Sequence, residues 1–214
     1  MEPRTGGAID ELIRDPASRR SFLRSAGGVG VAGAFSLFAA ACGGKDDEIK
    51  PETATTNDLA IVNYALGLEY LEQDFYRGVI SARILRGREL DLAKRIESNE
   101  TEHVAALEAA AKTLDGEPVA REETDFSSVL SGGRGKVLRT AATIEGVGAG
   151  AYLGQARFIE SKEVLASALS IHTVEGRHAA VLNRIVGRPI SPAGAFAEPL
   201  SKAQVTKSVE PFIA

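Results

Sequence analysis

The sequence predicts an all-α protein, a bundle of four helices arranged as two helical hairpins with a long connection between the second and third helices. Aromatic residues make up only 6% of the chain and tryptophan is absent, a composition that favours helices over strands. Apolar residues recur at helical spacing over four long segments. Short breaks divide these segments into two pairs, and a longer polar stretch separates the pairs.

The four helices have recognisable start and stop signals. Capping side chains at Thr56-Asn57-Asp58 precede the first helix, and glycines at 87 and 187 end the first and the last. The polar, glycine-bearing stretch 117–135 is expected to cross between the hairpins. We expect the bundle over 57–189 and a proline-containing tail over 190–214 that wraps the outside. The helices themselves are expected over 56–86, 90–114, 136–160 and 162–186.

The first 41 residues have the features of a targeting segment. The stretch Ser18-Arg19-Arg20-Ser21-Phe22-Leu23 precedes a weakly apolar run over 26–41, which is shorter than the roughly 20 apolar residues of a membrane span. The paired arginines followed by Phe and Leu resemble a twin-arginine export signal. Small residues before Cys42 resemble a lipoprotein cleavage site, with an ordinary buried thiol as the alternative. The resemblance implies export to the periplasm or cell envelope, a lipid anchor on Cys42 and a polar tether over 42–56.

Charge and cysteine content exclude several classes of protein. The net charge is −4, so the chain lacks the basic footprint of a nucleic-acid-binding protein. A single cysteine excludes an internal disulfide and cysteine-rich zinc or iron–sulfur sites. A metal ion would therefore need histidine and carboxylate ligands.

Two of the three histidines follow a glutamate by three positions, as Glu100/His103 and Glu175/His178. Three residues along a helix bring two side chains to one face, so each pair can bind one ion. A single pair of this kind would be weak evidence, but two pairs from three histidines are not.

The other two helices repeat a second pattern. Tyr76 follows Glu69 by seven positions, and Tyr152 follows Glu145 by seven, which is nearly two helical turns. Each glutamate precedes the Glu-x-x-His of the next helix by about the same interval, 31 and 30 positions. The two halves of the chain therefore form an internal repeat in their polar residues.

These residues resemble the ferritin-like di-iron/di-manganese carboxylate superfamily, and the stretch 68–76 is similar to its exported bacterial and plant desiccation-related members. The resemblance implies a ferritin-like four-helix bundle that binds two iron or manganese ions, with mixed occupancy open. Glu100 and Glu175 would bridge the ions. The first ion would be bound chiefly by Glu69, Glu100 and His103, and the second by Glu145, Glu175 and His178.

The donor set suits that chemistry. Four carboxylates offset the charge of two divalent ions, and mixed oxygen and imidazole ligands suit iron or manganese better than copper(I). Related proteins often carry an Asp immediately before the Glu of each Glu-x-x-His, where it accepts a hydrogen bond from the opposite histidine. Asn99 and Val174 stand at these positions here.

Several residues keep two interpretations. Tyr76 and Tyr152 are core tyrosines, or catalytic residues that hydrogen-bond a ligand or shuttle an electron. His172 and Glu97 are candidates for an added ligand or a neighbouring contact. The glycines at 146, 148, 150 and 154 serve close packing, or leave room for dioxygen. The other acids of these helices are expected on solvated faces, namely Glu72, Asp74, Glu102 and Glu108. Glu97 is expected there too if it is not a ligand.

The predicted function is redox chemistry on ferrous iron, oxygen or peroxide in the cell envelope, and manganese catalase is a further enzymatic option. The alternative is a non-enzymatic stress- or desiccation-protective or binding protein with a structural or vestigial metal site. The expected partners are metal ions, a small oxidant such as oxygen or peroxide, and the membrane through the lipid anchor. A homodimer is left open, whereas a lipid tether on every subunit disfavours a storage cage.

Overall fold

The computed structural model describes residues 58–214. Over this part the chain is helical and has no strand, which confirms the predicted all-α fold. The predicted export signal over 1–41, Cys42 and the tether over 42–56 lie outside the described residues. None of the described helices is long and apolar enough to cross a membrane.

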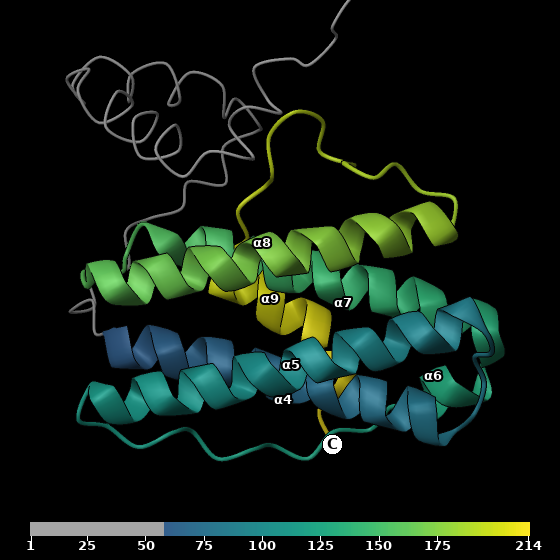
Figure 1. The fold of residues 1–214 in the computed structure, drawn as a ribbon, viewed down its shortest axis with the longest axis horizontal. Helices are drawn as coiled ribbons and strands as arrows, with labels where there is room; N and C mark the ends of the chain where they lie inside the picture. The colour runs from purple at the N-terminus through teal and green to yellow at the C-terminus, as the bar shows by residue number, and fades with distance from the viewer. Residues whose placement is uncertain (1–57) are drawn as a thin grey trace, which may run out of the picture. The chain divides into compact units, whose positions relative to one another are not determined.

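Four long helices form the bundle, and they pair as two hairpins (Figure 1). α4 packs chiefly against α5, and α7 chiefly against α8, while α4 also contacts α7 and α5 contacts α8. The connection between the hairpins contains the short helix α6 (Ser127–Ser131). The four helices are α4 (Asp58–Ser81), α5 (Arg88–Thr113), α7 (Gly133–Ala156) and α8 (Lys162–Ile185).

The helix ends differ from the sequence prediction by a few residues. α4 ends at Ser81, before the predicted end near residue 86, because Arg83 adopts a left-handed backbone with φ of 55°. Leu85 is nevertheless 3% exposed, so the apolar pattern continues past the end of the helix. The spacing of apolar residues indicates which positions are buried, and buried positions continue beyond the last residue of the helix.

The crossover runs along the length of the bundle before it reaches α6 (Figure 1). Arg121 fixes it to α4. Its guanidinium donates to Asp74 at 2.6 Å and to the side-chain oxygen of Gln73 at 2.5 Å, and it lies 4.2 Å from the centre of the Tyr70 ring. The long connection is therefore attached to the first hairpin along its course.

The C-terminal segment packs against α7. It contains α9 (Lys202–Val209) and a 3₁₀ turn (Glu210–Phe212), and Val205 is fully buried. The backbone N–H of Leu200 donates to the carbonyl of Gly150 at 2.9 Å. A Cβ atom on Gly154 would lie 1.9 Å from the carbonyl oxygen of Leu200. At Gly150 and Gly154, glycine thus permits close packing of the tail on the helix.

Two apolar clusters divide the interior along the bundle axis. One contains Phe75, Tyr76 and Val79 from the second half of α4, and the other contains Val62 and Leu66 from its first half. The glutamates of α4 lie between these two sets in the sequence. The polar residues predicted to bind metal therefore occupy the middle of the bundle, with an apolar cluster toward each end.

Candidate metal centre

Each of the four long helices contributes one glutamate of the predicted ligand set to the middle of the bundle. Their exposed fraction is 0% in every case. α5 and α8 each add a histidine three residues after the glutamate, because this spacing returns the side chain to the same helix face. The structure thus brings together all six side chains predicted from the sequence: Glu69, Glu100, His103, Glu145, Glu175 and His178.

The six side chains form two overlapping groups of four. In each group, one ligand atom per residue lies within 4.8 Å of the others. Glu100 and Glu175 belong to both groups, as expected of bridging carboxylates. The first group adds Glu69 and His103, and the second adds Glu145 and His178. This division matches the two ligand sets that the sequence resemblance implies.

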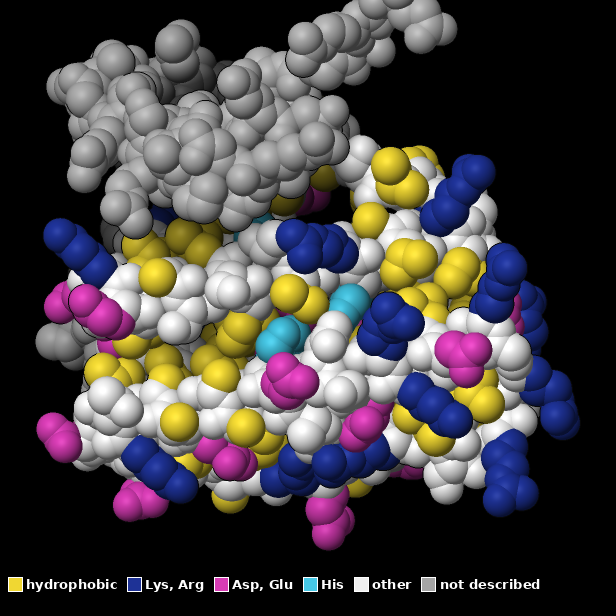
Figure 2. Space-filling model, viewed as in Figure 1, with side chains coloured by type: hydrophobic (Ala, Val, Ile, Leu, Met, Phe, Trp, Pro, Cys, Tyr) yellow, Lys and Arg dark blue, Asp and Glu magenta, His cyan; other side chains and the backbone are white. Residues whose placement is uncertain are grey.

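The histidines form the outer edge of the centre. His103 is 9% exposed and His178 7% exposed, whereas the glutamates between them are inaccessible. Figure 2 shows histidine side chains reaching the surface where α5 and α8 run beside each other, with hydrophobic side chains next to them. The clustered side chains therefore reach solvent at the seam between these two helices.

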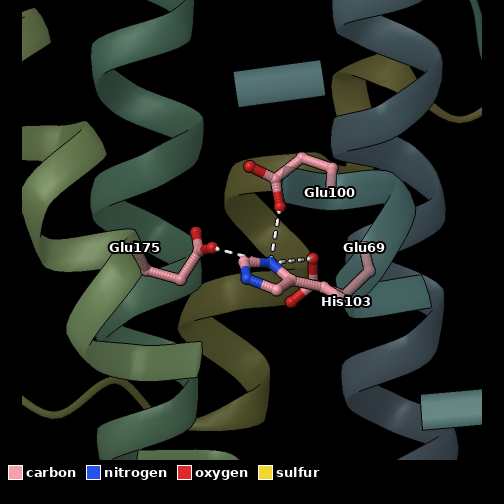
Figure 3. Close-up of side chains that lie close together, drawn as sticks. All are labelled: Glu69, Glu100, His103 and Glu175. Carbon is pink, nitrogen blue, oxygen red and sulfur yellow. Dashed lines mark hydrogen bonds and ion pairs between the residues drawn. The ribbon is translucent and has the colours of Figure 1, made fainter. Parts of the chain in front are cut away.

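Both histidines turn Nδ1 toward the carboxylates. Nδ1 of His103 lies 2.8 Å from Glu100, 3.2 Å from Glu69 and 3.4 Å from Glu175 (Figure 3). Nδ1 of His178 lies 3.0 Å from Glu145 and 3.2 Å from Glu100. One nitrogen of each ring thus faces several carboxylate oxygens at once. This arrangement is expected if the nitrogen and these oxygens bind the same metal ion.

Each predicted tyrosine donates to the glutamate of the opposite half. The hydroxyl of Tyr76 on α4 donates to Glu145 on α7 at 2.5 Å, and that of Tyr152 on α7 donates to Glu69 on α4 at 2.5 Å. The repeat seen in the sequence is therefore a reciprocal pair of contacts across the α4–α7 interface. Both tyrosines hold one carboxylate oxygen in place and leave the other directed at the centre.

The residues beside the Glu-x-x-His pairs differ between the halves. The amide of Asn99 lies 3.0 Å from Nε2 of His178, which is the position at which a partner orients a ligating imidazole. The amide nitrogen, Nδ2, faces Nε2 in this structure; if Nδ1 of His178 binds metal, Nε2 keeps its hydrogen, and the amide accepts after a flip that brings its oxygen to this place. Val174 stands at the corresponding place in the other half and offers no side-chain acceptor.

The two further candidate ligands take other roles. Nδ1 of His172 donates to the carbonyl of Ala149 at 3.0 Å and so links α8 to α7. Glu97 accepts from Arg77 at 3.2 Å on a partly exposed face. Neither belongs to the two groups found among the described residues.

The expectation that Glu72 lies on a solvated face is wrong. Its side chain is 2% exposed, and its Oε2 is buried without a hydrogen-bond partner. Glu72 follows Glu69 by three residues, so the same helical spacing that identifies the metal ligands would have placed it beside them. The other acids named with Glu72 are half-buried or exposed, namely Asp74, Glu97, Glu102 and Glu108.

The cluster holds protons where it lacks a cation. Burial raises the pKa of Glu69 to about 7 and raises that of Glu175 well above its ordinary range. Burial would lower the pKa of His103, but hydrogen bonds with Glu100, Glu175 and Glu69 outweigh it and raise the value to about 12. The pKa of Glu100 falls to about 2, because hydrogen bonds from both histidines outweigh its burial. The buried cluster thus retains protons in the absence of metal, and it would favour the binding of cations in their place.

The residues fit a pair of metal ions. Oε2 of Glu175 is buried without a hydrogen-bond partner, and Oε1 of Glu100 and Oε1 of Glu175 meet only the imidazoles, at 3.2 and 3.4 Å; a bound cation would satisfy these buried oxygens. Four carboxylates and two imidazoles from four helices form the donor set of ferritin-like dinuclear sites. Oxygen and nitrogen donors without sulfur suit iron and manganese.

Comparison with known families agrees with the fold and the site. A family described as the ferritin-like domain matches residues 57–188, which is more than half of the chain and contains all six clustered residues. No curated protein matches the sequence. The chain belongs to the ferritin-like domain family.

Proposed function

We propose that this chain is an exported, lipid-anchored protein that binds a dinuclear iron or manganese centre and performs redox chemistry on ferrous iron, oxygen or peroxide. The observation that carries the proposal is the convergence of Glu69, Glu100, Glu145, Glu175 and two histidines in the middle of the bundle. Export and the anchor on Cys42 rest on the sequence of the first 42 residues alone.

The side chains around the site position its carboxylates for ions that change oxidation state. A bound pair of iron or manganese ions supplies a centre that exchanges electrons with oxygen or peroxide. Glu69 and Glu145 are held by the tyrosine hydroxyls, and their remaining oxygens face the centre. Glu100 and Glu175 belong to both groups of clustered residues, so they would hold the two ions jointly. The apolar clusters toward each end keep water away.

A small apolar cavity favours a neutral oxidant. It has a volume of about 30 Å³, enough for a molecule the size of water or dioxygen, and lies where α4 and α8 begin. Ile61, Ala65, Leu107 and Ala168 line it, and Tyr152 forms part of its wall. Because Tyr152 also donates to Glu69, a small apolar molecule in this cavity would lie beside a residue that contacts the centre.

One observation favours the non-enzymatic alternative. Val174 gives His103 no side-chain acceptor at the position where Asn99 serves His178. Loss of such a partner typically costs about 10- to 100-fold in metal affinity or activity. In that alternative, the metal holds the four helices together, and the protein protects or binds an envelope component.

Oxidation of bound Fe(II) separates the two functions. The full-length chain would be loaded with Fe(II) without oxygen and then mixed with oxygen or peroxide, with ferrous iron followed by a colorimetric chelator. We expect oxidation faster than that of free Fe(II), and Glu145→Ala should abolish this gain while the exposed-site control Glu102→Gln retains it. Binding of Fe(II) without faster oxidation by either oxidant would reject the redox function and leave the structural role.

A further inference from the structure

Among residues 58–214, Glu72 is the one buried acid that lies outside both groups of clustered residues. It shares the inner face of α4 with Glu69 and Tyr76, three residues before it and four after it. Its side chain is 2% exposed, and Oε2 has no hydrogen-bond partner. A buried carboxylate oxygen without a partner is costly, so its presence calls for a compensating contact.

The internal repeat explains where this acid fits. Position 72 in the first half corresponds to position 148 in the second, since each follows its ligand glutamate by three residues. The second half has glycine there. A Cβ atom on Gly148 would lie 2.7 Å from Oε1 of Glu72 and 3.0 Å from Oε2 of Glu175. The space left by the missing side chain is therefore flanked by one oxygen from each of these two carboxylates.

These contacts are unfavourable between two anions. Burial raises the pKa of Glu72 well above its ordinary range, and the neighbouring Glu175, Glu69, Glu145 and Glu100 raise it further. The positively charged partners in the centre, His103 and His178, contact the other four glutamates. Without metal, protonation compensates Glu72; in the loaded site, a metal ion on the Glu175 side would do so.

We propose that Glu72 is a seventh protein ligand, which binds the dinuclear centre on its Glu175 side through the space that Gly148 leaves open. This inference rests on the proposed metal centre. A fifth carboxylate gives the ligand set one negative charge more than two divalent ions supply, so it favours a state in which one ion is trivalent. It also makes the two halves of the site differ in their number of carboxylates, because the second half has Gly148 at the position of Glu72.

Cobalt(II) titration of the full-length chain under anaerobic conditions tests this ligand. Glu72→Gln keeps the shape of the side chain and removes its charge, and Gly148→Ala fills the space between the two carboxylates. The matched control for the latter is Gly146→Ala, because a Cβ at Gly146 meets nothing within 4 Å. Glu102→Gln, at an exposed position, controls for loss of a glutamate.

We expect wild type and both controls to bind about two Co(II) per chain with the same visible absorption. Glu72→Gln and Gly148→Ala should weaken one of the two binding steps by about 10-fold or more and change the absorption. A Glu72→Gln protein with wild-type affinities and spectrum would overturn the seventh ligand while leaving the dinuclear centre intact. A wild-type chain that binds no Co(II), Fe(II) or Mn(II) would overturn both.

Discussion

At the scale of single residues, the centre is a balance between protons and metal ions. Seven buried side chains carry ionisable groups within a short distance, five carboxylates and two imidazoles. Without metal, the histidines hold protons that the carboxylates attract, and Glu175 is kept neutral by burial. Metal ions replace these protons, so binding and protonation compete for the same atoms.

Metal affinity should therefore rise with pH. Burial opposes protonation of His178, but its hydrogen bonds with Glu100 and Glu145 raise the pKa to about 9, so its proton must leave at neutral pH before Nδ1 can bind an ion. Each proton released strengthens binding by about tenfold per pH unit. Mn(II) titrations across neutral pH, with released protons followed by an indicator dye, measure this. Equal affinity at every pH, without proton release, would contradict the account.

The tyrosine contacts make a second prediction. Tyr152→Phe removes the hydroxyl that donates to the buried Glu69, so the free energy of unfolding of the metal-free protein should fall by about 1–3 kcal/mol. Tyr64→Phe is the matched control, because the Tyr64 hydroxyl is buried without a partner and its loss should cost little. Urea denaturation compares the two, and equal losses would mean that the Glu69 contact contributes nothing.

The sequence analysis predicts the six clustered residues but does not place Glu72, a fifth buried acid, beside them. The Glu-x-x-His pairs and the Glu-x6-Tyr repeat are local patterns, and helical geometry converts each into a shared face. Glu72 satisfies the same spacing, but its approach to Gly148, a residue on another helix 76 positions away, exists only in the folded chain. Such a pairing depends on tertiary contact, which periodicity within one helix does not report.

At the scale of elements, the spacing of apolar residues predicts where the four long helices lie, but it does not predict where they end. All four long helices appear where apolar residues repeat, whereas α4 and α7 end several residues before the predicted ends. Leu85 and Ile159 continue the apolar pattern beyond the helices, because the connections also pack on the core. The sequence favours close packing at the glycines of α7 and a tail on the outside, but it does not predict that Leu200 meets Gly154, because this contact exists only in the folded chain.

Two glycines of α7 should respond to alanine with opposite signs. Gly154→Ala places a Cβ 1.9 Å from the Leu200 carbonyl and must displace the tail, at a cost of about 1–3 kcal/mol. Gly146→Ala enters open space at an exposed position and should gain up to about 1 kcal/mol from helix propensity. Thermal or urea unfolding gives both values. A stabilising Gly154→Ala would show that the tail does not dock on α7 in solution.

At the scale of the whole molecule, the centre joins elements that otherwise meet weakly. Each hairpin packs chiefly within itself, and the two hairpins share fewer contacts across α4–α7 and α5–α8. The reciprocal tyrosine contacts and the clustered carboxylates lie at these junctions. Metal ions bound by all four helices would hold the two hairpins together, so binding and folding stability are coupled.

The central claim is that the six clustered residues form a dinuclear metal site, and a count of bound metal tests it most directly. The full-length chain and Glu100→Ala/Glu175→Ala, which removes both shared carboxylates, would be analysed by inductively coupled plasma mass spectrometry after loading with Fe(II) or Mn(II). The account predicts about two ions per wild-type chain and their loss in the double variant, with the helical content of both retained. A folded wild-type chain that binds neither metal would contradict it.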